Sequence, residues 1–577
     1  MRTLELLAPA KDLECGLAAI DHGADAVYIG AEKFGARAAA GNSLADIQRL
    51  TDYAHQFGAK VFVTVNTIVF ERELQATQQL ITDLARIGVD ALLVQDMATL
   101  AMRRVALGEV GHVPQLHAST QCDTRSAEKV RWLRQLGFTR VVLARELSVE
   151  EIGAIHREVP NVELEVFVHG ALCVSYSGVC YASQHCFQRS ANRGECAQFC
   201  RMKFDLLDAD GQLIEHDRYL LSMKDLCQID HLEELADAGA SSFKIEGRLK
   251  DVNYVKNVVS AYSRRLDELV ARRPDAYRRA SFGTVAYQFE PSLRKTFNRG
   301  FTHYFLHGRG PDIASFDTPK ALGEYVGTVK EVRRQSFNVA GTASFANGDG
   351  LCFLTDGRTL EGFRVNRAVG NRLYPFKMPQ GLKAGVGLYR NNDVAFEKAL
   401  AGPTACRKMG VHLSLDLTAD GFALTLRVPF LNEEARATVA FGHQPAKKPQ
   451  ADNIVKQSSI WCPADRLDIP SWRGGVLPLT YNKSLADSDF KEDYVAEREQ
   501  LFADNLNMAY VAFTRPKDVL LAWGVKAVPK TDKAAPRAVV SSIAARLIGV
   551  CKISAWNCIM KLFRDAPPLT VSAVNGN

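Results

Sequence analysis

The 577-residue sequence lacks the long apolar segments of membrane-spanning or secreted proteins. Its N-terminus, MRTLELLAPAKDLE, carries a charged residue every few positions and has no apolar core like that of a signal peptide. No uninterrupted apolar run reaches the roughly 18 residues that a membrane-spanning helix requires. We therefore expect a soluble, cytoplasmic protein that has no membrane partner.

A strong charge excess is also missing. The chain has 71 basic and 65 acidic side chains, which gives a formal net charge of +6. This excess is too small to predict nucleic-acid binding by itself, although it permits an RNA partner. The length and the 47% hydrophobic content allow two to four domains.

Several catalytic motifs do not occur in the sequence. It contains no H-E-x-x-H, no G-x-S-x-G and no G-x-x-x-x-G-K-[ST]. These absences argue against a zinc protease of the common helical type, a serine hydrolase with a nucleophile elbow, and a P-loop ATPase.

The first 250 residues repeat one pattern, in which a short apolar run is followed by an amphipathic stretch with helical spacing. Continuous apolar runs are typical of strands that are buried on both faces of a parallel sheet. Eight strands alternating with helices predict an α/β fold, a TIM-like (β/α)8 barrel over residues 1–275, although a doubly wound sheet also fits. The expected strands are 4–8, 26–30, 60–66, 91–96, 115–120, 140–145, 162–169 and 242–247.

The C-terminal ends of these expected strands are unusually polar. In barrels of this kind, the catalytic side chains lie at that end. The polar residues there are Asn66, Gln95, Asp96, His117, Ser119, Thr120, Arg145, Glu146, His169, Lys244, Glu246 and Arg248.

The pattern changes after the predicted barrel. Residues 276–442 show short alternating runs separated by Gly and Asn, which predict a β-rich domain. Residues 443–457 are polar and aperiodic and predict a linker. Residues 458–577 form the remaining segment.

Six of the 13 cysteines lie within 55 residues, and they are the strongest chemical signal in the sequence. Clustered thiols in a reduced compartment are more often metal ligands than disulfides. Paired C-x2-C knuckles, which are common in zinc sites, are absent, so the spacing favours an iron–sulfur cluster held from loops. The isolated Cys15, Cys122, Cys352 and Cys406 are expected to be small buried apolar residues. The clustered cysteines are Cys173, Cys180, Cys186, Cys196, Cys200 and Cys227.

The stretch EVFVHGALCVSYSGVCYAS resembles the signature of the peptidase U32 family, also called collagenase-like. Further similar stretches are ELLAPA, GADAVYIG, HASTQ, NRGECAQFCR, SMKDL, SFKIEGRLKD, KTFNRGFT and FANGDG, so the resemblance covers residues 1 to about 440. LARELS and SANRG are most similar to the branch that hydroxylates ribosomal or transfer RNA. This resemblance implies an enzyme that forms 5-hydroxycytidine in 23S ribosomal RNA without O2, with a 4Fe-4S cluster and prephenate as co-substrate.

The resemblance also implies the cluster ligands. Cys173, Cys180 and Cys196 match the family pattern, and the fourth ligand is either Cys227, which we place slightly ahead, or Cys200. Cys186 matches no position of the pattern. The electron donor is not indicated.

Six residues at the strand ends are candidates for catalysis. Arg145, Lys244 and Arg248, together with Lys250 beyond them, are suited to holding a carboxylate or a phosphate. His117 and His169 are candidates for proton transfer near neutral pH, and Glu246 completes the set. The ordinary alternatives are a Lys244–Glu246 ion pair that closes the barrel and a His169 that caps a strand end.

Two other functions are consistent with the sequence. The first is a peptidase of the collagenase-like type, which the family name suggests. The second is a noncatalytic RNA- or protein-binding scaffold in which the cysteines hold a structural metal.

The last segment, residues 458–577, resembles a fragment of a different protein class. Residues 505–521 are similar to the last motif of UvrD-like helicases, with Arg515 in the place of the phosphate-sensing arginine. Such a motif works only with a P-loop, which is absent, so we expect no ATPase activity. We also expect loose packing or low order in this segment, because its apolar strand MAYVAF lacks the rest of a sheet.

Overall fold

The computed structural model describes residues 1–440, except 33–34, 36–40, 248, 411 and 429–432. The chain divides into two compact units, Met1–Arg407 and Lys408–Asn577. The expected linker at 443–457 and the helicase-like segment at 458–577 lie outside the described residues.

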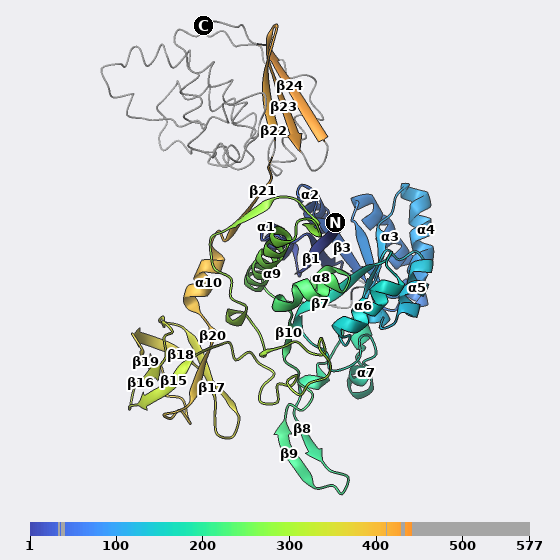
Figure 1. Cartoon of the computed structure of the whole chain (residues 1–577). Helices are drawn as coiled ribbons and strands as arrows, with labels where there is room; N and C mark the ends of the chain where they lie inside the picture. Colours follow the sequence, from blue (N-terminus) through green and yellow to red (C-terminus); the bar gives the residue numbers. More distant parts are fainter. Residues whose placement is uncertain (33–34, 36–40, 248, 411, 429–432, 441–577) are drawn as a thin grey trace, which may run out of the picture. The chain divides into compact units, whose positions relative to one another are not determined.

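Eight parallel strands in the first unit close into a barrel, as the sequence pattern predicted (Figure 1). Each strand pairs with the next along the chain, and the last one pairs with both β7 and β1, which closes the sheet. All eight expected strands are confirmed, with small shifts at their ends. They are β1 (Arg2–Ala10), β2 (Ala26–Gly30), β3 (Lys60–Val65), β4 (Ala91–Val94), β5 (Gln115–Ala118), β6 (Arg140–Val142), β7 (Glu163–Ala171) and β11 (Ala240–Ile245).

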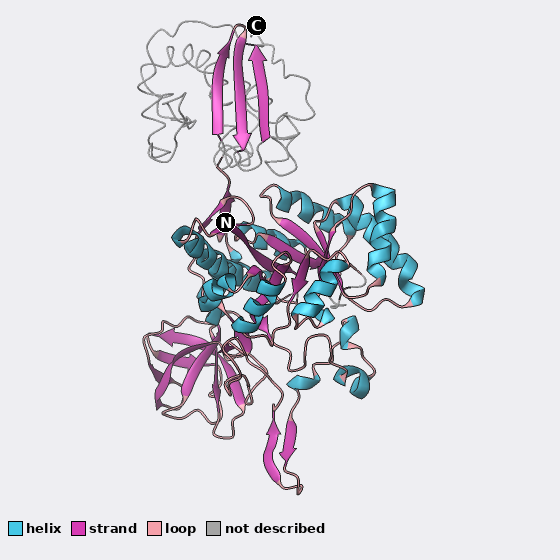
Figure 2. Ribbon diagram, turned by 45° about the vertical axis from the view of Figure 1, so that its right-hand side comes forward, coloured by secondary structure: helices cyan, strands magenta, loops and turns pink. Residues whose placement is uncertain are grey.

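Helices cover the outside of this barrel (Figure 2). The second of them shows why: Ser43 caps its first turn by accepting a hydrogen bond from the Asp46 amide, and its buried face carries Ile47, Leu50 and Ala54. These side chains pack in one apolar core with the outward-facing residues of the strands. The helices are α1 (Leu13–Asp21), α2 (Leu44–His55), α3 (Leu74–Ile87), α4 (Ala98–Val110), α5 (Ala127–Gln135), α6 (Val149–Glu158), α8 (Leu232–Asp237) and α9 (Val252–Arg272).

The inside of the barrel contains a buried network of charged side chains. Arg140 of β6 donates to Glu5 of β1, at 3.0 Å for one of its two hydrogen bonds, to Glu163 at 2.7 Å and to Glu165 of β7 at 3.3 Å. Ser242 of β11 also donates to Glu5, at 2.9 Å. Arg140, Glu5 and Glu165 are almost fully buried, so the network links four of the eight strands away from water.

This network changes the ionisation of its members. Burial by itself would raise the pKa of Glu5, but the Arg140 guanidinium outweighs it, and the net shift is downward from the ordinary value of 4.5. The pair therefore stabilises the fold above that pH, and this contribution is lost as the pH falls through the lowered pKa.

A long insertion separates β7 from β11 and contains the clustered cysteines. It includes α7 (Ala182–Phe187), a hairpin of β8 (Phe204–Leu207) and β9 (Leu213–Arg218), and β10 (Asp225–Cys227). The hairpin forms its own two-stranded sheet and extends away from the barrel in both views (Figures 1 and 2). In contrast, β10 pairs antiparallel with the end of β7 and so returns the chain to the barrel.

The segment expected to form one β-rich domain at 276–442 is divided in the structure. A closed antiparallel barrel of six strands occupies residues 324–392, within the first unit. A separate three-stranded sheet of β22 (His412–Thr418), β23 (Gly421–Val428) and β24 (Glu433–Ala440) belongs to the second unit. The six strands are β15 (Glu324–Val332), β16 (Phe337–Ala340), β17 (Gly350–Leu354), β18 (Leu360–Val369), β19 (Arg372–Pro375) and β20 (Gly387–Asn392).

The first unit also contains shorter elements around these two barrels. They are β12 (Tyr277–Arg279), β13 (Thr284–Tyr287), β14 (Phe301–Thr302), α10 (Val394–Ala401) and β21 (Ala405–Lys408), the last of which ends at the boundary between the units. Within the described part of the chain, no helix combines the length and the apolar character needed to cross a bilayer.

Replacing Arg140 with Leu should destabilise the barrel by about 3–5 kcal/mol, because it leaves the Glu5 and Glu165 carboxylates buried without their cation. Urea unfolding followed by circular dichroism measures the effect. Arg131→Ala is the matched control, since its ion pair with Glu158 is exposed and should contribute less than about 1 kcal/mol. Equal unfolding midpoints for the two variants would contradict this account of the network.

Candidate active site

Charged side chains from two different strands meet at the C-terminal end of the barrel. Arg145 follows β6, Glu246 follows β11, and their side chains form an ion pair at 3.0 Å. The guanidinium of Arg145 also lies 3.7 Å from the ring centroid of Phe167 on β7. Arg145 is therefore held in a fixed position, because it is both paired and stacked.

The cysteine-bearing segment is held against the loops that follow β3, β5 and β6. The amide of Ser177 donates to Glu146 at 3.1 Å, after β6. Arg193 pairs with Glu73 at 2.6 Å, after β3, and the guanidinium of Arg125, after β5, lies 4.3 Å from the ring centroid of Tyr176. The segment thus lies against the C-terminal end of the barrel, where catalytic groups of this fold gather.

A glycine within this segment allows a close approach to the barrel. Gly178 has a φ of +77°, and a Cβ atom at this position would lie 2.3 Å from the carbonyl oxygen of Gln121. Any other residue would therefore clash with the backbone that follows β5 and would also be strained. This explains the glycine that stands between Cys173 and Cys180.

The fold brings four thiols close enough to affect one another. Burial raises the pKa of Cys200, the adjacent Arg201 lowers it, and the thiols of Cys173, Cys196 and Cys180 raise it further. Burial likewise raises the pKa of Cys173, Arg145 lowers it, and Cys180 and Cys196 raise it. Cys200 is fixed through Arg201, which donates to the carbonyls of Met223 at 2.7 Å and Leu172 at 3.0 Å.

Cys227 occupies a different environment. It is the last residue of β10, is buried, and has its sulfur 3.8 Å from the hydroxyl oxygen of Tyr262. Burial raises its pKa, and the main groups that modify this shift are the Ile229 amide, Tyr262, Asp230 and Arg294. The groups that shift the pKa of Cys200 thus include the three cysteines that the sequence pattern singled out, whereas those that mainly shift the pKa of Cys227 are Tyr262, Asp230, Arg294 and the Ile229 amide.

The donor set suits an iron–sulfur cluster. Four cysteines, whose thiolates would be soft ligands, lie close enough to influence one another, and hydrogen bonds to sulfur are one of the means by which proteins tune such clusters. The sulfur of Cys196 accepts from the Gln198 amide at 3.4 Å and lies 4.0 Å from the Ser183 hydroxyl. Arg145 and Arg201 supply positive charge beside Cys173 and Cys200.

Buried polar atoms that lack a hydrogen-bond partner among the described residues also gather at this end of the barrel. Buried polar groups are nearly always satisfied, so such atoms indicate a place for water or a bound molecule. They follow β4, β5 and β6 and are Gln95 Oε1, Thr120 Oγ1, Asp123 Oδ1 and Glu146 Oε2.

Lys244 and His117 lie inside the barrel rather than at its open end. Lys244 is buried and donates to Glu165 at 2.6 Å, with its ammonium 4.6 Å from the ring centroid of Tyr28. Neither ring nitrogen of His117 has a partner among the described residues, and burial lowers its pKa well below the usual value. His117 is therefore neutral at pH 7, and Lys244 is part of the buried network.

His169 is enclosed by aromatic rings. Its Nδ1 lies 3.3 Å from the Tyr262 hydroxyl, and its ring packs near Tyr254, Tyr262 and Phe301. Burial lowers its pKa to about 3, and the charge of Lys250 acts in the same direction. The geometry does not support the proton transfer near neutral pH that we expected of His117 and His169, because both rings stay neutral there.

Two of the expected cations, Arg248 and Lys250, remain to be placed. Arg248 lies outside the described residues. Lys250 has its ammonium 3.3 Å from the ring centroid of Phe297, and burial lowers its pKa to about 8. Lys250 therefore keeps most of its charge at pH 7.

A groove of about 590 Å³ begins immediately after Cys173. Val174, Ser175 and Tyr176 form one side, and Tyr304 and Phe305, whose rings stack with centroids 3.9 Å apart, lie on another. The lining is mostly apolar and includes one arginine, Arg309. A groove of this size and composition suits a small planar group.

The carboxylates of the Arg140 network were not predicted as a group. Glu5, Glu163 and Glu165 stand within otherwise apolar strands, and this interruption was a visible signal. The aromatic pair Tyr304–Phe305 was not predicted either, because it lies on a loop that no periodicity indicates.

Comparison with known proteins agrees with this arrangement. The sequence model described as peptidase family U32 matches residues 11–315, which is more than half of the chain. This chain, a (β/α)8 barrel that carries a cysteine-rich insertion at its C-terminal end, belongs to the peptidase U32 family.

Individual relatives carry both hydroxylation and protease names. A protein named 23S rRNA 5-hydroxycytidine C2501 synthase, from Escherichia coli (strain K12), is 46% identical over 431 residues, covering 73% of this chain and 64% of the relative. A tRNA hydroxylation protein P1 from Bacillus subtilis (strain 168) is 36% identical, covering 46% and 64%. A collagenase from Porphyromonas gingivalis (strain ATCC BAA-308 / W83) is 32% identical, covering 53% and 74%.

This chain matches 64% of the length of the Escherichia coli relative, so part of that protein has no counterpart in the match. The family match ends at residue 315, and none of these names refers to a helicase. The comparisons therefore give no support to the resemblance of residues 505–521 to a helicase motif.

Thiol labelling of the metal-free, folded protein tests how the cysteines are arranged. Cys227 should react with iodoacetamide on the order of tenfold more slowly than the exposed Cys186, because it is buried and its thiol has a raised pKa. Mass spectrometry of peptides sampled over time gives both rates from one reaction. Labelling of Cys227 as fast as that of Cys186 would show that β10 is not packed against the barrel.

Proposed function

We propose that this protein is an RNA hydroxylase that forms 5-hydroxycytidine in 23S ribosomal RNA in the cytoplasm. The observation that carries the proposal is the convergence of four thiols beside Arg145 and an aromatic groove, in a chain that is 46% identical to a 23S rRNA 5-hydroxycytidine synthase. The tRNA hydroxylation proteins among its relatives support the same class of reaction.

Cys173, Cys180, Cys196 and Cys200 would hold a 4Fe-4S cluster. When bound, such a cluster supplies electron transfer or an iron that is open to a ligand. The chain provides the surroundings: Arg145 and Arg201 place positive charge beside the thiols, and Ser183 and the Gln198 amide approach the sulfur of Cys196.

The chemistry of the side chains supports the proposed substrate and co-substrate. A cytosine ring is planar, and the stacked Tyr304 and Phe305 offer aromatic surface in a groove large enough for it. Prephenate carries two carboxylates, for which the guanidinium of Arg145 is a suitable partner, and Glu246 fixes the orientation of that guanidinium. Lys250 adds a second cation near Glu246.

The peptidase alternative finds less support in the geometry. Within the described ranges, no cysteine or serine side chain is hydrogen-bonded to a histidine ring, which a Cys–His or Ser–His mechanism requires. Cys227 and His169 are cross-strand neighbours, but both are buried, and their pKa values are shifted toward the uncharged forms.

Iron content distinguishes the two candidates for the fourth ligand. Cys200→Ser should lose most of the iron and the visible absorbance of anaerobically purified protein, because it removes one of four converging thiolates. Cys227→Ala and Cys186→Ser should keep both, since these thiols lie outside the group. Loss of iron from Cys227→Ala with retention in Cys200→Ser would reverse the assignment.

The substrate is tested by complementation of a bacterial strain that lacks its own 23S rRNA 5-hydroxycytidine synthase. The wild-type chain should restore 5-hydroxycytidine, measured by mass spectrometry of nucleosides from 23S rRNA. Arg145→Ala should reduce the yield by roughly tenfold or more, since it removes a charge-assisted contact of about 1.5–3 kcal/mol.

Arg131→Ala, which removes only an exposed ion pair with Glu158, is the control and should restore the modification fully. Hydroxyuridine in transfer RNA without 5-hydroxycytidine in 23S rRNA would move the proposal to a tRNA substrate. Absence of any hydroxylated nucleoside, together with cleavage of gelatin by the purified protein, would favour the peptidase instead.

A further inference from the structure

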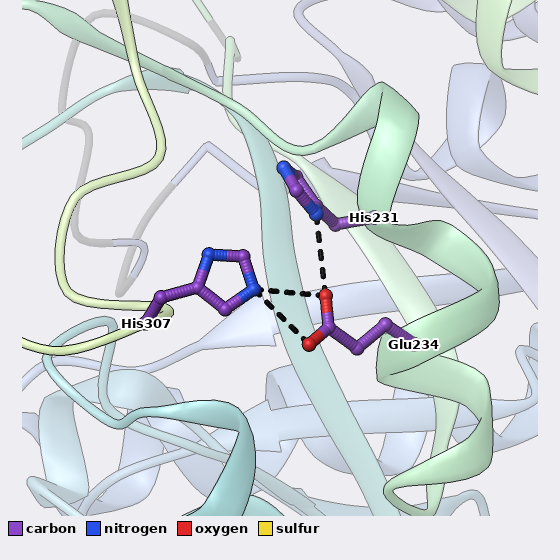
Figure 3. Close-up of side chains that lie close together, drawn as sticks. All are labelled: His231, Glu234 and His307. Carbon is purple, nitrogen blue, oxygen red and sulfur yellow. Dashed lines mark hydrogen bonds and ion pairs between the residues drawn. The ribbon is translucent and has the colours of Figure 1, made fainter.

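A second group of metal-ligating side chains lies apart from the four thiols. His231 precedes α8, Glu234 lies on it, and His307 comes from the segment after β14 (Figure 3). One potential ligand atom from each of the three lies within 4.8 Å of the others. From these positions we infer that His231, Glu234 and His307 bind a divalent transition-metal ion of the zinc class.

The distances between the potential ligand atoms fit a small tetrahedral site. Zinc bound at 2.0–2.1 Å separates its ligand atoms by about 3.3 Å. His231 Nδ1 lies 3.2 Å from Glu234 Oε2, and His307 Nε2 lies 2.9 Å from the same oxygen. Two of the three separations thus match those of a zinc site, and the third pair, the ring nitrogens of His231 and His307, lies within 4.8 Å.

The chemistry of the three ligands selects the ion. Imidazole nitrogen favours zinc and its neighbours in the first transition row, whereas magnesium and calcium prefer oxygen alone. Partial exposure of all three side chains leaves the site open to ions from solution.

A third histidine, His303, packs against the ring of His231. The ring centroid of His303 lies 4.5 Å from that of His231, and its Nδ1–H donates to the carbonyl oxygen of Cys227 at 3.0 Å. That hydrogen bond fixes the orientation of the His303 ring and leaves its Nε2 as an acceptor. His303 is therefore a positioning residue beside the three ligands.

Such an ion would connect two segments that are distant in sequence. Residues 303–307 carry Tyr304 and Phe305 of the groove, and this segment also contacts α6 through the Val149 amide, which donates to the Leu306 carbonyl at 3.0 Å. A metal shared between α8 and His307 would fix the end of this aromatic segment. The inference does not depend on the hydroxylase proposal, because none of the three ligands belongs to the thiol group.

The test separates this site from the thiols, which also bind zinc. Zn²⁺ is titrated by calorimetry into the full chain in which Cys173, Cys180, Cys196 and Cys200 are all serine. We expect one ion per chain, and we expect His307→Ala in the same background to weaken binding at least about 100-fold. His55→Ala is the control, because His55 pairs with Asp90 alone. Equal binding with and without His307, or no binding in the serine background, would overturn the proposal.

A second measurement uses a chain whose cysteines are intact. Zn²⁺ should raise the melting temperature of the wild-type chain and of His55→Ala by several degrees, because the ion binds only the folded state. The rise should be smaller in Glu234→Gln and in His307→Ala, which lose a ligand but keep any binding at the thiols. An equal rise in all four proteins would assign the effect to the thiols and contradict the second site.

Discussion

The buried guanidinium of Arg140 is the interaction on which the rest of the structure depends. It draws together carboxylates from β1 and β7, and Ser242 of β11 joins the same network. A charge of this kind is tolerated away from water only because several partners surround it. Its geometry therefore ties the first strand of the barrel to the last two, and this closure fixes where the C-terminal ends of the strands lie.

The interior of the barrel and its C-terminal end have different roles. Toward its middle, Glu5, Arg140, Glu165 and Lys244 satisfy one another and serve stability. At the C-terminal end, Arg145 and Glu246 are only partly buried, several polar atoms lack hydrogen-bond partners among the described residues, and four thiols lie close enough to influence one another. Groups whose bonding is incomplete in the protein are those that a cofactor or substrate can complete, which is why the chemistry is assigned here.

The sequence predicted the strands of the barrel well, because strands buried on both faces leave continuous apolar runs such as AVYIG and KVFVTVN. It did not predict which cysteine joins Cys173, Cys180 and Cys196, because spacing along loops does not determine where their thiols lie. Cys227 stands in a short strand that returns to β7, and no spacing along the chain predicts that pairing. The lowered pKa values of His117 and His169 could not be predicted either, because they follow from burial, and burial of a strand end depends on what covers it.

We propose that four particular thiols hold iron at the C-terminal end of the barrel. Anomalous scattering at the iron edge, from crystals grown without oxygen, tests this directly. Iron density bonded to Cys173, Cys180, Cys196 and Cys200 is expected next to the Arg145–Glu246 pair. Iron bonded to Cys227, or fully loaded crystals with no iron near Cys173, would contradict it.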